Sequence, residues 1–306
     1  MPNRSLALLV FSLILLLPAC AGQQPLQKKQ SRAEALDRKG AEAFHQGEYP
    51  KALGYFKKSL QVYESIDHRE GVAQSLNSIG TVYQVTGQVY QAVECFDRAL
   101  AINSSIGKEE GVSSNLNNLG TVNLVLRRPK IALELFQRSL AIEEKRGDGA
   151  AQAVRWNNIG LAQFRLGQPA QAEYAYLKSR ELNEKAGNAS GVADNLNNLG
   201  TLYESRRDWG RALESFQEAL ELDRNQENSL GIGSDLASLG RVYEAMGEPE
   251  KALDHFLRAL KVNESLGLKD RVLGDLIRIA SLYEALGNRG QAEKFRERVK
   301  ELAASK

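Results

Sequence analysis

The sequence predicts an all-α protein built as a solenoid of seven antiparallel helix-turn-helix repeats. Two series of small residues carry this prediction, because each recurs every 40 residues along the 306-residue chain. Apolar residues between these positions follow helical spacing, and such self-similarity is the signature of a repeat array. The seven repeats occupy residues 33–304, which leaves no room for another domain. The series are Gly40, Gly80, Gly120, Gly160, Gly200 and Gly240 with Ala280, and Ala52, Ala92, Ala132, Ala172, Ala212, Ala252 and Ala292.

The N-terminal segment differs from the repeats. Arg4 precedes a nearly unbroken apolar run, Leu6 to Leu17, which is shorter than the roughly twenty residues of a bilayer span but suits a secretory signal. The ending LPAC, residues 17–20, resembles the bacterial lipobox. The resemblance implies a signal peptide over residues 1–19 and lipidation of Cys20. An ordinary signal peptide or a short membrane anchor are the alternatives.

The segment that follows is expected to be a flexible tether. Residues 20–32 are polar and basic and have no apolar periodicity. In lipoproteins the residue after the lipidated cysteine influences sorting, and Ala21 is not the aspartate associated with inner-membrane retention. The resemblance therefore implies an outer-membrane anchor with the repeats facing the periplasm of a bacterial envelope.

Each repeat is predicted to contain two helices joined by a tight turn. In the second repeat, Gly87 lies between the two apolar patterns and can adopt the left-handed conformation that ends a helix. A helix pair of this size cannot bury its apolar stripe alone, so neighbouring repeats must stack. The first pattern is Leu76, Ile79, Gly80 and Tyr83; the second is Ala92, Val93, Phe96, Ala99 and Leu100; the turn residue recurs as Gly47, Gly167, Gly247 and Gly287, with Arg127 and Arg207 in its place in two repeats.

A period near 40 residues also fits HEAT repeats, armadillo repeats and β-propeller blades. The helical spacing excludes a propeller, and the residues themselves separate the helical families. The pattern W-x2-L-G-x2-Y, then A-x3-F and a small residue, can be read in two stretches: Leu76-x2-Ile79-Gly80-x2-Tyr83 with Ala92-x3-Phe96 and Ala99, and Leu196-x2-Leu199-Gly200-x2-Tyr203 with Ala212-x3-Phe216 and Ala219. Trp156 supplies the consensus tryptophan in the fourth repeat.

On these motifs the chain resembles the tetratricopeptide repeat (TPR) family. The resemblance implies a right-handed superhelix that binds protein or peptide partners in a concave groove. Two features depart from the common pattern: the period is 40 rather than 34, and Ser104 and Glu144 stand where the second helix usually ends in proline. We therefore expect the second helices to continue to about Gly107, Gly147, Gly187 and Gly267, as in the kinesin-light-chain and peptide-sensing branches.

The recurrent mid-helix glycines require a packing explanation. A glycine inside a helix costs about 1 kcal/mol relative to alanine. We expect the glycine series to pack against the alanine series where the two helix axes cross, since neither residue has bulk there. On this basis Gly120→Leu should overpack the crossing and destabilise the array.

The candidate binding residues lie on the first helix of each repeat. Steps of 100° per residue from the packing residues Leu116 and Leu119 identify a side that faces away from the second helix. The resemblance places that side on the concave wall. Asparagine is a poor helix former, but its amide can both donate to and accept from a peptide backbone. The residues are Asn77, Asn117, Asn157 and Asn197, with Thr81, Thr121 and Thr201 one turn further on.

Other polar residues extend this site. Asn118, Asn158 and Asn198 point toward the neighbouring repeat, so they lie either between repeats or at the groove edge. Bonding between helices, or simple solvation, is the alternative for the whole asparagine ladder. Toward the C-terminus, Arg241 and Arg278 could bind a carboxylate, or could pair with Glu244 or Glu284 on their own helices.

Several functions are not supported by the sequence. The net charge is +2, which gives no basis for nucleic-acid binding. His45, His68 and His255 have neither metal-ligand nor triad spacing, and no GxxxxGK, HExxH or GxSxG motif occurs, so we expect no metal, no cofactor and no enzyme activity. The remaining cysteine, Cys95, is expected to be a buried apolar residue.

The expected function is a protein- or peptide-binding scaffold in the cell envelope, of the kind that serves assembly, secretion or pilus machinery. A regulatory sensor that binds a short peptide or small ligand is the first alternative. An enzyme is a remote one.

Overall fold

The computed structural model describes residues 19–304, and in this range the chain forms fourteen α-helices and no strand. The all-α solenoid of seven helix pairs is therefore confirmed. The helices are α1 (Ala19–His45), α2 (Tyr49–Glu64), α3 (Arg69–Val85), α4 (Val89–Ser105), α5 (Glu109–Val125), α6 (Pro129–Arg146), α7 (Gly149–Arg165), α8 (Pro169–Lys185), α9 (Ala189–Ser205), α10 (Trp209–Asn225), α11 (Ser229–Ala245), α12 (Pro249–Ser265), α13 (Lys269–Ala285) and α14 (Arg289–Ala304).

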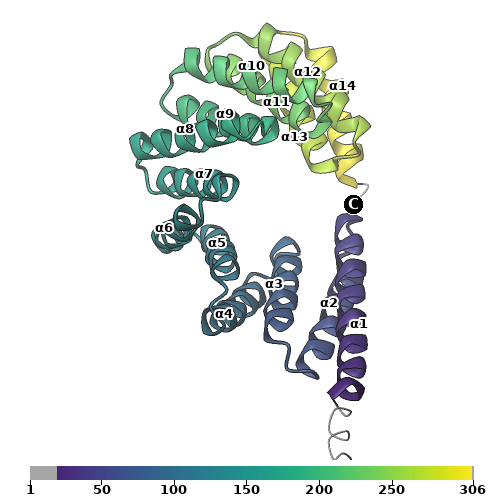
Figure 1. Ribbon diagram of the computed structural model, residues 1–306. Coiled ribbons are helices and arrows are strands. Elements are labelled where there is room, and N and C mark those ends of the chain that lie inside the picture. The colour runs from purple at the N-terminus through teal and green to yellow at the C-terminus, as the bar shows by residue number, and fades with distance from the viewer. Residues whose placement is uncertain (1–18, 305–306) are drawn as a thin grey trace, which may run out of the picture. The chain divides into compact units, whose positions relative to one another are not determined.

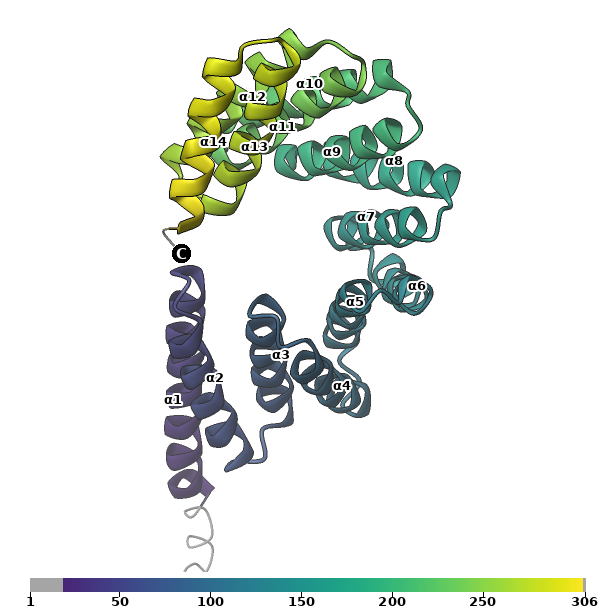
Figure 2. The same ribbon diagram turned by 180° about the vertical axis from the view of Figure 1, so that it is seen from behind.

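The chain divides into two compact units, and the division falls inside α5. Unit 1 extends to Val122 and unit 2 begins at Asn123. Each helix in the series α1 to α4 packs against the next one along the chain, and the same holds in the series α6 to α14 (Figures 1 and 2). The odd-numbered helices are the first helices of the repeats and the even-numbered ones the second helices, so repeat four consists of α7 and α8.

Left-handed residues end the helices where the sequence predicts them. Gly87 has φ of 77°, and Arg127 and Arg207 adopt the same conformation with φ of 57° and 59°. The backbone N–H of Gln88 then donates to the carbonyl of Tyr83 at 2.8 Å, which satisfies one of the last carbonyls of α3. The second helices continue to the predicted glycines, since α4 ends at Ser105 and α6 at Arg146.

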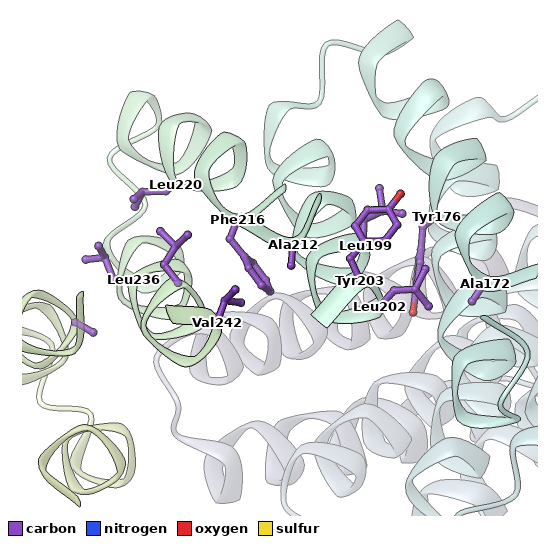
Figure 3. Close-up of a cluster of buried hydrophobic side chains, with 12 residues drawn as sticks. Ala172, Tyr176, Leu199, Leu202, Tyr203, Ala212, Phe216, Leu220, Leu236 and Val242 are labelled. Carbon is purple, nitrogen blue, oxygen red and sulfur yellow. The ribbon is translucent and has the colours of Figure 1, made fainter. Parts of the chain in front are cut away.

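The core of each unit consists of apolar side chains from consecutive helices. Figure 3 shows one cluster of unit 2, in which Tyr176 of α8 and Phe216 of α10 lie among Leu199, Leu202 and Leu236. Each of these side chains is at most 2% exposed. Cys95 is buried in unit 1, as the sequence predicts, and burial raises the pKa of its thiol.

The recurrent glycines face aromatic rings, which corrects the expected contact with the alanine series. A Cβ added to Gly200 would lie 2.7 Å from Cε1 of Phe216, and the three atoms nearest to it all belong to that ring. Gly80 and Phe96 stand in the same relationship at 2.7 Å. Ala212 of the alanine series is fully buried. The ring of Phe216, four residues after Ala212, occupies the space that the missing side chain of Gly200 leaves.

The structure also differs from the expected tether. Residues 21–32 belong to α1, which begins at Ala19 and contains Pro25. Gln, Lys, Arg and Ala are good helix formers, and the repeat helix that follows has already met the cost of nucleation, so the helix extends backward. Residues 1–18 of the predicted signal peptide, which spans residues 1–19, and the side chain of Cys20 lie outside what the structure describes. From Ala19 onward, no helix is both long and apolar enough to cross a membrane.

Candidate functional site

The asparagines of unit 1 form a hydrogen-bonded network between repeats. Oδ1 of Asn77 in α3 accepts from Nδ2 of Asn115 at 3.0 Å and from Nδ2 of Asn118 at 2.9 Å, both in α5. Nδ2 of Asn103, in α4, donates to Oδ1 of Asn115 at 2.8 Å. Three consecutive helices are thus connected through side-chain amides, and Asn115 is 1% exposed.

Unit 2 contains the same arrangement 80 residues later. Oδ1 of Asn157 in α7 accepts from Asn195 at 3.0 Å and from Asn198 at 2.8 Å, both in α9. Oδ1 of Asn195 accepts from Asn183 of α8 at 2.9 Å. The second position of the sequence-predicted ladder, Asn118 and Asn198, therefore lies between repeats and bonds to the first position of the preceding repeat.

The buried centre of this network was missed by sequence reasoning. Asn115 and Asn195 are each the first residue of the repeated heptad NLNNLGT, and the exact repetition of that asparagine was the available signal. The hydrogen-bond partners of their Oδ1 atoms are Asn103 and Asn183, which lie twelve residues earlier, on the preceding second helix. Buried amides need hydrogen-bond partners, and this pairing provides them.

Other repeats of unit 2 fill the equivalent buried positions with charged residues. Nε of Arg155 donates to Oγ of Ser139 at 2.7 Å, and its Nη2 lies 3.6 Å from Oε1 of Glu143. Further along, Nδ2 of Asn263 donates to Oδ2 of Asp275 at 2.7 Å. Burial lowers the pKa of Arg155 and raises the pKa of Asp275 to about 6.

Asp235 occupies the position of Asn195 one repeat later and has a different environment. It is fully buried, and neither carboxyl oxygen has a hydrogen-bond partner in good geometry. Burial, together with the nearby carboxylate of Asp223 and more weakly that of Asp194, raises its pKa to about 7, while Asn197 opposes the shift. Two acidic groups thus meet where other repeats place two amides.

The predicted threonines bond to their own helices. Oγ1 of Thr81 donates to the carbonyl of Asn77 at 3.0 Å, and Oγ1 of Thr201 donates to that of Asn197 at 2.9 Å. Thr121 does the same with the carbonyl of Asn117 at 3.1 Å. These hydroxyls use their hydrogen locally, as threonines in helices often do, and keep an acceptor oxygen.

The two predicted arginines pair with glutamates of the preceding first helix. Nη2 of Arg241 in α11 lies 3.4 Å from Glu204 of α9, and Nη1 of Arg278 in α13 lies 3.0 Å from Glu244 of α11. The expected pairing within one helix is therefore wrong. The arginine side chains remain 38% and 51% exposed, so these pairs contribute little to stability and leave the guanidinium groups accessible.

These residues and two apolar neighbours define the first-helix face of unit 2. Val154 and Ile277 are large hydrophobic residues 48% and 49% exposed, at helix positions turned away from the second helices. We use this name for the side of α7, α9, α11 and α13 that carries Val154, Asn157, Asn158, Asn197, Thr201, Arg241, Ile277 and Arg278. Among residues 19–304, no group of three or more His, Cys, Asp or Glu side chains could hold a metal ion.

A family model described as tetratricopeptide repeat matches the chain in five overlapping windows, residues 31–105, 71–145, 111–185, 151–225 and 191–265. The chain belongs to the tetratricopeptide repeat family. None of the curated proteins compared with this TPR protein matches its sequence.

Solved structures resemble the TPR protein over most of its length. The apo form of RapI has a TM-score of 0.69 at 16% identity, covering 89% of this chain and 97% of its own. Aspartyl phosphate phosphatase F from Bacillus subtilis has a TM-score of 0.70 at 15% identity, with coverage of 92% and 73%. The apo form of the quorum sensor NprR from B. thuringiensis has a TM-score of 0.61 at 14% identity, with coverage of 93% and 78%. At these identities the similarity concerns the fold.

Proposed function

We propose that this TPR protein is a non-enzymatic scaffold whose first-helix faces hold peptide segments of partner proteins. The observation that carries the proposal is the composition of the first-helix face of unit 2. Half-exposed amides, hydroxyls, guanidinium groups and apolar side chains lie there on successive helices. This is the mixture that binds a peptide, because amides pair with its backbone and apolar side chains hold its hydrophobic residues.

The charges on this face favour a peptide with a carboxylate. Arg241 and Arg278 each have a glutamate partner across a partly exposed gap, and such pairs exchange readily for another carboxylate. A guanidinium group can bind a carboxylate through two parallel hydrogen bonds. We therefore place an acidic residue or a C-terminal carboxylate of the peptide near α11 and α13.

The acidic pair of the network does not favour an enzyme. Asp223 and Asp235 are 2% and 0% exposed, so a substrate cannot reach their carboxyl groups without unfolding of the surrounding helices. A general acid or base must lie within hydrogen-bond reach of its substrate.

A peptide sensor is the second candidate. Similar folds are found in the quorum sensor NprR and in a Rap protein complexed with Competence and Sporulation Factor. Under this reading, binding of a short peptide would change the conformation of the protein. X-ray scattering separates the two candidates, because a sensor changes its radius of gyration when the peptide is added and a passive scaffold does not.

Affinity capture from bacterial envelope fractions tests the scaffold. The wild-type chain is compared with Asn117→Ala plus Asn197→Ala, which removes one amide from the first-helix side of each unit. The matched control is Asn225→Ala, an exposed asparagine at the end of α10. We expect the double variant to lose partners that the wild type and the control retain, at unchanged helical circular dichroism. Capture of the same partners by all three chains would show that the amides do not bind them.

We also propose that the protein is a lipoprotein of the bacterial envelope, anchored in the outer membrane, whose partners belong to assembly, secretion or pilus-type machinery. The support is the sequence of residues 1–20, with its apolar run and LPAC ending. Metabolic labelling with palmitate should mark the wild-type chain and not Cys20→Ser. Equal labelling of both chains would contradict the anchor.

A further inference from the structure

A largely apolar cavity of about 520 Å³ lies on the second-helix side of unit 2, away from the first-helix face. Residues of α6, α7 and α8 line it. The rings of Trp156 and Tyr174 meet edge to face there, with centroids 5.8 Å apart, and Leu140 and Ile159 add aliphatic surface. A cavity of this size and character falls in the range of small-molecule sites.

The fourth repeat departs from the others at the residues that build this cavity. Trp156 occupies a position that is leucine in all six other repeats: Leu36, Leu76, Leu116, Leu196, Leu236 and Leu276. Tyr174, which is 56% exposed, stands where most repeats have an acidic residue: Glu94, Glu134, Glu214 and Asp254. Gln163 replaces the tyrosine found at this position in four repeats: Tyr83, Tyr203, Tyr243 and Tyr283. The repeat framework requires none of these residues.

Two polar groups of the lining lack an evident structural role. Oε1 of Gln163 is buried without a hydrogen-bond partner, although buried polar atoms are normally paired. Glu144 is the one charged residue in the lining, and it is exposed. The lining also contains the amides of Gln137 and Gln171. It therefore combines aromatic surface, three amides and one negative charge, and no lining residue is positively charged.

We propose that this cavity binds an aromatic amine. The ring of the ligand packs against Trp156 and Tyr174, and the ammonium group is attracted by the exposed carboxylate of Glu144. Aromatic faces also attract cations, which adds to the selectivity for a positively charged ligand. The site is independent of the proposed peptide-binding face, so either assignment can fail without the other.

Isothermal titration calorimetry of the full chain with tryptamine tests the proposal. Tryptamine has a flat ring, a ring N–H and an ammonium group. We expect saturable binding with one site per chain, and binding about tenfold weaker for uncharged indole, which lacks the ammonium group that Glu144 attracts. Indole-3-acetate, which has the same ring and a negative charge, should not bind.

Substitution of cavity residues by the residues that other repeats carry at the same positions tests whether tryptamine binds in this cavity. These substitutions are compatible with the repeat fold. Trp156→Leu and Tyr174→Glu install residues that neighbouring repeats already carry, and each should weaken tryptamine binding at least tenfold at an unchanged melting temperature. Glu144→Gln should remove the preference for tryptamine over uncharged indole. Tyr90→Glu, at an exposed tyrosine of unit 1, is the matched control and should bind like the wild type. Absence of saturable binding at millimolar tryptamine, or equal binding by wild type, Trp156→Leu and Tyr174→Glu, would overturn the proposal.

Discussion

Nδ2 of Asn198 donates a 2.8 Å hydrogen bond to Oδ1 of Asn157, one repeat earlier in unit 2. Oδ1 of Asn157 also accepts a hydrogen bond from Nδ2 of Asn195, so one amide oxygen bonds to two residues of the next repeat. Asn77 has the same relationship with Asn118 and Asn115 in unit 1. The recurring asparagines therefore contribute to the stacking of repeats, whatever they bind.

Asn157→Ala should destabilise unit 2 by about 1 kcal/mol. Loss of a partner for buried polar groups costs roughly 1–3 kcal/mol, and the better helix propensity of alanine offsets about 0.5 kcal/mol of this. Urea unfolding followed by tryptophan fluorescence measures it, because both tryptophans, Trp156 and Trp209, lie in unit 2. Asn225→Ala is the control, and equal midpoints for the two variants would show that the bonds to Asn157 contribute nothing.

Two glycine substitutions in unit 2 should have opposite effects. Gly200→Ala places a methyl group 2.7 Å from the buried ring of Phe216, and overpacking of this kind costs about 1–3 kcal/mol. Gly274→Ala, in the interior of α13, meets nothing within 4 Å and should stabilise the unit by up to about 1 kcal/mol through helix propensity. The same urea experiment checks both. Stabilisation by both substitutions would contradict the glycine-to-ring packing.

Asp235→Asn should stabilise unit 2 at alkaline pH and have little effect in acid. The folded-state pKa of Asp235 is raised from 3.8 to about 7, so the folded state holds the proton more tightly than the unfolded state. The contribution of this group to stability is therefore present below about pH 4 and is lost as the pH rises to about 7. A shift of this size corresponds to roughly 2–4 kcal/mol at pH 8.

The measurement is the difference in the free energy of unfolding between Asp235→Asn and the wild type, at several pH values from 4 to 8. Asparagine is the natural residue at the equivalent positions 115 and 195, so the variant is compatible with the fold. Asp254→Asn, at an exposed carboxyl group, is the control. A difference that stays constant across this pH range would show that Asp235 titrates normally.

Much of the fold could be predicted from the sequence, because helix spacing and a 40-residue period leave few alternatives. The left-handed conformation of turn glycines such as Gly87 could be predicted from their position, whereas the structure adds that Arg127 and Arg207 adopt it too. The partner of each glycine could not be predicted in the same way. Whether Gly200 contacts Ala212 or Phe216 depends on where the axes of α9 and α10 cross. The position of that crossing cannot be obtained from a helical projection of one helix.

The candidate site was only partly predictable, for a similar reason. Steps of 100° per residue place Asn118 and Asn198 toward the neighbouring repeat, and their hydrogen bonds lie there. The role of Asn195 depends on Asn183, which belongs to another helix, so the sequence of α9 alone does not indicate it. Contact of Asn197, Thr201 or Arg241 with a ligand stays a prediction, because partner binding depends on a second molecule.

Site-specific photo-crosslinking tests the binding scaffold most directly. p-Benzoylphenylalanine is placed either at Thr201, on the first-helix face of unit 2, or at Glu221 of α10, an exposed second-helix residue of the same repeat. Irradiation in cells, followed by purification, reveals whether a partner lies within reach of each position. The scaffold predicts a discrete crosslinked partner from Thr201 and none from Glu221. A partner crosslinked from Glu221 and absent from Thr201 would contradict binding at the first-helix face.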